Sequence, residues 1–76
     1  MKRFFFDFMT NEQSLYDYSG DEFVSPQSAI EFAHATAQLL KHSLSGDWIG
    51  WSIVVRNAEG EKFFSLAVGT PETIAA

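Results

Sequence analysis

The sequence predicts an α+β domain of the order β-β-α-β-β, with one helix packed on one face of a four-stranded, mainly antiparallel sheet. Four short segments have the apolar or alternating pattern of strands, and one longer segment has the three-and-four spacing of an amphipathic helix. A chain of 76 residues builds a single thin core. We therefore expect one domain over residues 1–70 and a frayed C-terminal tail over residues 71–76.

The first expected strand covers residues 3–9, where Phe4, Phe6 and Phe8 alternate with residues for the opposite face. A polar, turn-like stretch follows, and residues 15–18 then form a short second strand that pairs with the first as a hairpin. Gly20 and the acidic residue after it end this second strand.

The third and fourth expected strands cover residues 51–56 and 62–68. The turn between them, residues 57–60, ends in Gly60, which supplies the positive φ of a bulged hairpin. If all neighbouring strands are antiparallel, the strand order 2-1-3-4 satisfies their directions.

The helix has the clearest boundary signals. Ser25 fits the N-cap, because its hydroxyl can accept a hydrogen bond from a free amide of the first turn. Pro26 fits the first helical position, where its missing N–H costs nothing, and Gly46 is the expected stop. The apolar stripe expected to face the sheet consists of Ile30, Ala33, Ala37, Leu40 and Leu44.

The charge and the residue types narrow the classes of partner. Ten acidic residues against five basic ones give a net charge of −5 at pH 7, and the basic residues are scattered. Because nucleic acids and anionic membranes attract clustered Lys and Arg, we expect neither as a partner. The absence of cysteine excludes disulfides and cysteine-based zinc sites. The first apolar run, residues 4–6, is too short for an export signal, so we expect a cytoplasmic protein.

No pattern in the sequence indicates catalysis or a cofactor. Glu31 and His34 form one Glu-x-x-His pair, but a carboxylate-bridged metal site needs a second pair on a facing helix. Asp17, Asp21 and Glu22 lack the alternating spacing of a calcium loop, and a solvated turn that blunts the sheet edge explains them better. We therefore expect no catalytic, metal or cofactor residues, and no enzyme.

One helix covers only one face of the sheet, so the other face indicates where a partner would bind. The alternation assigns Phe4, Phe6, Phe8, Ile53, Val55, Phe64, Leu66 and Val68 to the helix side. The outer face then receives a mostly polar set that includes Asp7 and Arg56. Phe5, Val54 and Phe63 are its apolar members, and together they would form an association patch, unless they are scattered or covered.

Trp48 and Trp51 complete the expected interaction surface. Strand alternation places residues three apart on opposite faces, so one Trp would be in the core and the other partly exposed. In the alternative arrangement both rings close the end of the core.

The order of these motifs resembles a family of short bacterial domains of unknown function, common in soil- and plant-associated bacteria. The family opens with Arg and aromatic residues before an acidic or His position, which Arg3-Phe4-Phe5-Phe6-Asp7-Phe8 matches. Its Asp-x-x-Gly-x-Glu-hydrophobic segment before an Ala-rich helix is matched by residues 17–23, and its Val-Arg-Asn/Asp-x-x-Gly hairpin by residues 55–60. The resemblance covers about residues 3–68 and implies the fold, but no activity.

The sequence thus favours a non-enzymatic protein-interaction module, a homodimer that uses the uncovered sheet face or an edge strand. The first alternative is a small, acidic, antitoxin-like regulatory protein that binds a basic partner. The second is a binder of a small ligand, which requires a pocket beneath the aromatic strand.

Overall fold

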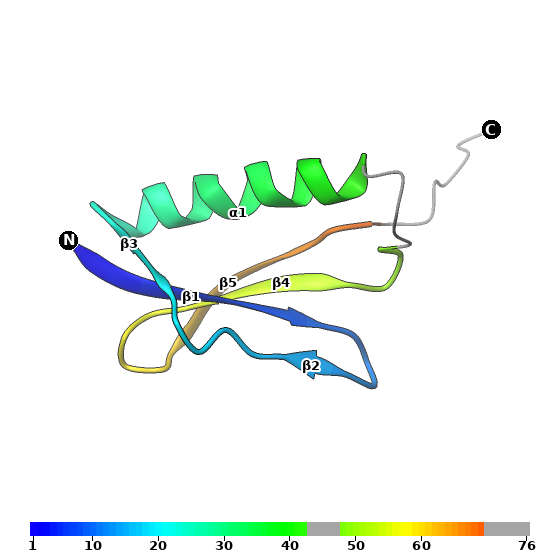
Figure 1. Ribbon diagram of the computed structural model, residues 1–76, viewed down its shortest axis with the longest axis horizontal. Coiled ribbons are helices and arrows are strands. Elements are labelled where there is room, and N and C mark those ends of the chain that lie inside the picture. Colours follow the sequence, from blue (N-terminus) through cyan, green and yellow to red (C-terminus); the bar gives the residue numbers. More distant parts are fainter. Residues whose placement is uncertain (43–47, 70–76) are drawn as a thin grey trace.

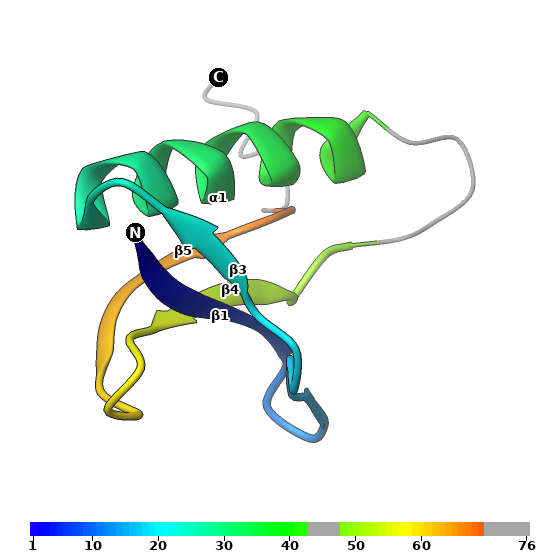
Figure 2. The same ribbon diagram turned by 60° about the vertical axis from the view of Figure 1, so that its left-hand side comes forward.

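A computed structural model describes residues 1–42 and 48–69 of the chain. These residues form β1 (Lys2–Met9), β2 (Ser14–Leu15), β3 (Asp21–Phe23), α1 (Pro26–Lys41), β4 (Ser52–Arg56) and β5 (Lys62–Ala67). The strands make an antiparallel sheet in the order β2-β1-β4-β5, with β3 also paired to β1 (Figure 1). The predicted α+β fold and the predicted strand order are confirmed, and α1 packs against one face of the sheet (Figure 2).

The edge beside β1 differs from the expected strand over residues 15–18. The chain pairs with the end of β1 through β2, leaves it, and pairs with the start of β1 through β3. Because Leu15 lies opposite Phe8 and Asp21 opposite Phe4, the five residues 16–20 face only three residues of β1. This excursion is a large bulge. β3 has three residues, two of them acidic, so it has neither the length nor the composition by which a strand is predicted.

The helix begins where the sequence places it. Ser25 is the N-cap, and its hydroxyl oxygen accepts a hydrogen bond from the backbone amide of Ser28 at 3.2 Å. The buried face carries Ala29, Ala33 and Ala37, so the helix lies close to the sheet. Ile30, expected in this stripe, is only half-buried. The expected stop at Gly46 and the stripe position Leu44 lie outside the described residues, as does the expected tail over residues 71–76.

The core lies between α1 and the helix side of the sheet. The three alanines of α1 pack on Phe4, Phe6, Ile53, Val55 and Val68, all of which are buried. Phe8, Phe64 and Leu66 are partly buried against this core, so the predicted helix side of the sheet is confirmed.

The β4–β5 hairpin has the predicted turn and bulge. Gly60 has a φ of +85°, and its amide donates a hydrogen bond to the carbonyl oxygen of Asn57 at 3.0 Å. The register of β4 and β5 shifts between Val55 and Arg56.

Candidate functional site

Among the described residues, Asp7 is the one polar or charged residue that is buried, and it lies on the sheet face away from the helix. Its side chain is fully buried, although the sequence places it on an exposed face. Arg56 donates to Asp7 Oδ2 from Nε at 2.5 Å and to Oδ1 from Nη2 at 3.1 Å. These hydrogen bonds raise the pKa of Arg56 above its ordinary value, against the opposing effect of burial. The expectation of a solvated Asp7 was wrong, because the arginine of the next strand covers it.

Asp17 attaches the residue 16–20 bulge to this pair. Its backbone amide donates to Asp7 Oδ1 at 3.0 Å, and its carbonyl oxygen accepts from Arg56 Nη2 at 3.3 Å. Its carboxylate accepts hydrogen bonds from the amides of Phe6, Ser19 and Gly20 at 3.2, 3.1 and 2.9 Å. Burial would raise the pKa of Asp17, but these amides and the charge of Arg56 together lower it. Both carboxylate oxygens therefore bond the protein's own backbone instead of a metal ion.

Gly20 allows the bulge to lie against β1. Its φ is +71°, and a Cβ atom at this position would lie 2.8 Å from the carbonyl oxygen of Phe4. A side chain at residue 20 is therefore excluded by both the backbone conformation and the available space.

Asp7, Asp17, Gly20 and Arg56 form what we call the Asp7 cluster. Its members come from the three stretches that carry the family resemblance, and the fold brings them together across β1, the bulge and β4. The contacts fix the bulge to the sheet, and the cluster contains no nucleophile beside a base. These four residues thus have a structural role. Opposite charges on neighbouring strands, at Asp7 and Arg56, were the sequence signal for this pair.

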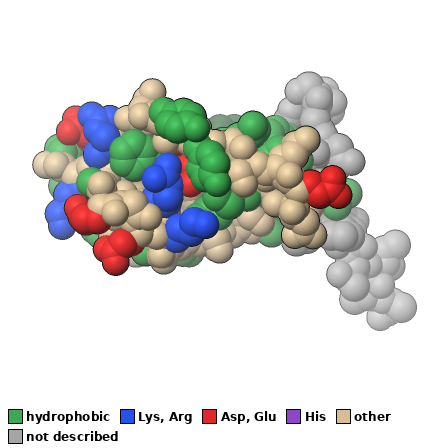
Figure 3. All heavy atoms as spheres, turned by 90° about the horizontal axis from the view of Figure 1, so that it is seen from below, with side chains coloured by type: hydrophobic (Ala, Val, Ile, Leu, Met, Phe, Trp, Pro, Cys, Tyr) green, Lys and Arg blue, Asp and Glu red, His purple; other side chains and the backbone are tan. Residues whose placement is uncertain are grey.

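The predicted outer patch of Phe5, Val54 and Phe63 is only partly assembled. Val54 and Phe63 line one shallow depression. The guanidinium carbon of Arg56, however, lies 5.1 Å from the centre of the Phe5 ring and covers it. Figure 3 shows this face, where hydrophobic and basic side chains lie next to one another near the middle.

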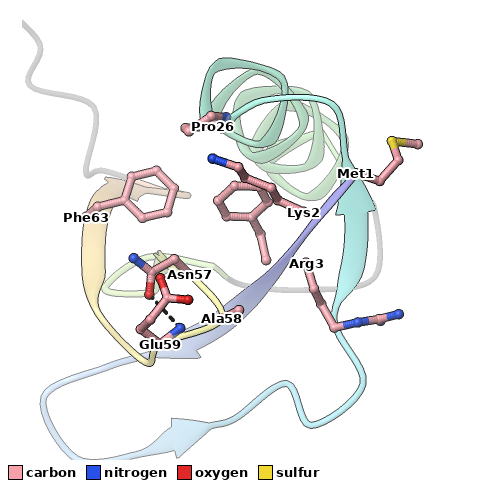
Figure 4. A pocket seen from close by; sticks show the side chains of 9 residues that line it. Met1, Lys2, Arg3, Pro26, Asn57, Ala58, Glu59 and Phe63 are labelled. Atoms are coloured by element: carbon pink, nitrogen blue, oxygen red, sulfur yellow. Dashed lines mark hydrogen bonds between the residues drawn. The ribbon is translucent and has the colours of Figure 1, made fainter.

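Phe63 is 37% exposed and also contacts the core, with its ring centre 5.5 Å from that of Phe4. It borders an open hollow of about 450 Å³ between the start of β1 and the β4–β5 turn. Figure 4 shows the Lys2 side chain extending over this hollow toward Pro26 and Phe63, whereas Arg3 points away.

Trp48 and Trp51 do not lie on opposite faces. Their ring centres are 5.7 Å apart in an edge-to-face contact, and Trp48 also contacts Phe8 at 6.0 Å. Opposite faces were predicted from strand alternation, but a turn places the amide of Trp51 3.1 Å from the carbonyl oxygen of Trp48. Both rings pack against the core, as the alternative arrangement required.

The two edges of the sheet differ in how well they are protected. The β2–β3 edge consists of a two-residue and a three-residue strand, separated by the bulge. The β5 edge is one six-residue strand, and Lys62 at its start is its single charged residue. Short strands, bulges and charges prevent edge-to-edge pairing. In β5 only the start of the strand has such features, namely the charge of Lys62 and the neighbouring register shift.

The described residues also bear on a metal site and on a membrane-spanning helix. Among residues 1–42 and 48–69, no group of three or more His, Asp or Glu side chains is placed to hold a metal ion. His34 instead contacts the ring of Phe64, with ring centres 5.5 Å apart. In the same part of the chain, no helix has the length and apolar character needed to cross a membrane.

Comparison with known proteins identifies a family for the chain and leaves its activity open. No curated protein and no solved structure matches the chain. A family model described as "Domain of unknown function (DUF6894)" matches residues 3–69. This range includes the whole Asp7 cluster, the helix and all the described strands except Lys2, the first residue of β1. The resemblance noted in the sequence is thereby confirmed, and the chain belongs to the DUF6894 family.

Proposed function

We propose that this chain is a non-enzymatic interaction domain that self-associates through the open edge of β5. The contrast between the two sheet edges carries the proposal. The β2–β3 edge is short, bulged and acidic, whereas β5 is regular and uncharged from Phe64 to Ala67. An uncharged, regular edge strand is a template for a further strand.

The backbone direction of β5 supports this use. The amide of Val68 donates to the carbonyl oxygen of Trp51 at 2.9 Å, so Val68 stands at a hydrogen-bonded position of the ladder and its N–H points toward the β4 side. Hydrogen-bonded and non-hydrogen-bonded pairs alternate in an antiparallel ladder. Ala67 and Ser65, opposite Ser52 and Val54, therefore direct their backbone N–H and C=O groups away from β4.

A second copy is the partner that fits this edge. An antiparallel arrangement about a two-fold axis near Ser65 lets each β5 satisfy the outward backbone groups of the other. Residues that lie opposite one another share a sheet face, so both helices lie on the same side of the joined sheet. Phe64 and Leu66, half-buried in one copy, gain apolar cover on that side. Ser65 and Ala67 are small and uncharged, so the outer side permits close approach.

The outer sheet face supports association less well than the edge. Arg56 already covers the Phe5 ring, and Asp7 bonds within the domain. Val54, on the neighbouring strand β4, and Phe63, on β5 itself, would border an edge-to-edge contact.

Sedimentation velocity over a range of concentrations tests the proposal. The wild-type chain is expected to form a dimer at high micromolar concentration. Ser65→Lys is expected to shift the population to monomer, because two like charges then lie close to the two-fold axis. The matched control is Ser14→Lys, the same change on the opposite edge of the sheet, and it is expected to leave the dimer intact. A monomeric wild type, or equal loss of dimer in both variants, contradicts the proposal.

A further inference from the structure

A hollow of about 340 Å³ lies between α1 and the β2 edge, on the helix side of β1. Its floor is Phe6 and Ile53, both buried. Phe32 and Thr36 of α1 form one wall, and Tyr16 belongs to the opposite wall. This hollow is separate from β5, which lies at the other edge of the sheet.

The hollow is apolar and aromatic, and its rings are partly open to solvent. Phe32 is 43% exposed, Tyr16 50% and Leu15 55%. Phe6 and Phe32 meet edge to face with ring centres 5.2 Å apart. The helix packs mainly over β3, β4 and β5, so the aromatic side chains nearest β2 keep an uncovered surface.

The hollow also carries a negative charge, on Asp21. Asp21 lies opposite Phe4 in the ladder, so its side chain is on the helix side of the sheet, and it lines the hollow. Its carboxylate has no hydrogen bond or ion pair with any described residue. Its neighbour Glu22 lies opposite Arg3 on the other face, at 4.0 Å from its guanidinium. The residues that line the hollow include no Lys or Arg.

We propose that this hollow binds a small organic cation with an aromatic or branched apolar body, of the arylalkylammonium class. Aromatic faces attract ammonium groups, and a nearby carboxylate adds to this attraction. The volume is at the lower end of the range of about 300–1,000 Å³ found for small-molecule sites, which fits a small ligand better than a helix of a partner protein. Two carboxylates line the hollow, Asp17 and Asp21. Asp17 accepts hydrogen bonds from backbone amides, whereas Asp21 has no partner among the described residues, so the charge of Asp21 favours a cation.

Two probes of similar size and opposite charge test the inference, phenethylammonium and phenylacetate. Amide chemical shifts are recorded while each probe is added to the wild-type chain. Phenethylammonium is expected to give saturable shifts at the residues that line the hollow, and phenylacetate is expected to give none. Asp21→Asn is expected to weaken phenethylammonium binding by about fivefold, the upper magnitude of one solvent-exposed ion pair.

The matched control is Glu22→Gln, a neutralised carboxylate one residue away on the opposite sheet face, which should bind phenethylammonium as the wild type does. Ser65→Lys should also bind it normally, because the hollow does not depend on the β5 contact. The absence of saturable shifts overturns the inference. Equal binding of both probes, or an unchanged affinity in Asp21→Asn, overturns it as well.

Discussion

Arg56→Ala is expected to lower the free energy of unfolding by about 3–5 kcal/mol, because it leaves the buried carboxylate of Asp7 without its charged partner. The Asp7 side chain is 0% exposed and that of Arg56 is 22% exposed, so the two charges are largely shielded from water while they are paired. The bulge loses its bond to Arg56 in the same step, through the Asp17 carbonyl oxygen. For a domain of this size the melting temperature should fall by more than about 12 °C.

Urea unfolding monitored by Trp fluorescence measures this loss, since both Trp rings contact the core. The matched control is Arg3→Ala, which removes an exposed hydrogen bond to the Ser19 carbonyl oxygen at 2.8 Å and a surface ion pair with Glu22 at 4.0 Å. Because both contacts are open to solvent, the change should cost only about 1 kcal/mol. A double variant, Asp7→Leu with Arg56→Leu, removes both charges and should be more stable than Arg56→Ala. Equal losses in Arg56→Ala and Arg3→Ala contradict the structural role of the Asp7 cluster.

Gly20→Ala is also expected to destabilise the domain strongly. A left-handed conformation costs a residue with a side chain about 1–2 kcal/mol. At φ +71° the new Cβ also meets the Phe4 carbonyl oxygen at 2.8 Å and the Phe5 ring at 2.9 Å. Because this oxygen belongs to the backbone of β1, the bulge itself must move, and the bonds of Asp17 weaken with it. The total should exceed about 2 kcal/mol.

Gly60→Ala separates the two causes. Gly60 has a similar φ of +85°, but nothing lies within 4 Å of a Cβ there. It should therefore show the conformational cost alone, and thermal unfolding of the two variants should differ clearly. The same melting temperature in both would show that the close approach at residue 20 does not contribute.

The sequence predicted those parts of the fold that depend on neighbouring residues. Ser25 and Pro26 mark the start of the helix through local chemistry, and Gly60 marks the hairpin turn in the same way. Alternation within β1 was sufficient to find the side of the sheet that faces the helix. Phe4 and Phe6 are two residues apart in one strand, so their side chains lie on the same face of the sheet, and both are buried.

Features that depend on distant residues were not predicted. The burial of Asp7 requires Arg56, which is 49 residues away in the chain. Residues 16–20 leave the ladder because the Asp17 carboxylate takes the place of a strand carbonyl at the Phe6 amide. The hollow beside Asp21 likewise depends on where the helix crosses the sheet. The spacing of apolar residues along the sequence does not determine that crossing position.

The family motifs and the open edge have different roles in this account. The Asp7 cluster holds the bulge on one side of β1 and thereby closes that edge of the sheet. The β5 edge has no comparable protection between Phe64 and Ala67. Self-association at β5 is the central claim that follows from this difference.

Cross-linking of single-cysteine variants tests this claim most directly, because the chain has no cysteine of its own. Ser65→Cys places one thiol on the β5 edge, and Ser14→Cys places one on the opposite edge. With a short bis-maleimide at the same protein concentration, Ser65→Cys is expected to give a covalent dimer and Ser14→Cys to remain monomeric. Equal cross-linking in both variants, or none in Ser65→Cys, would contradict the account.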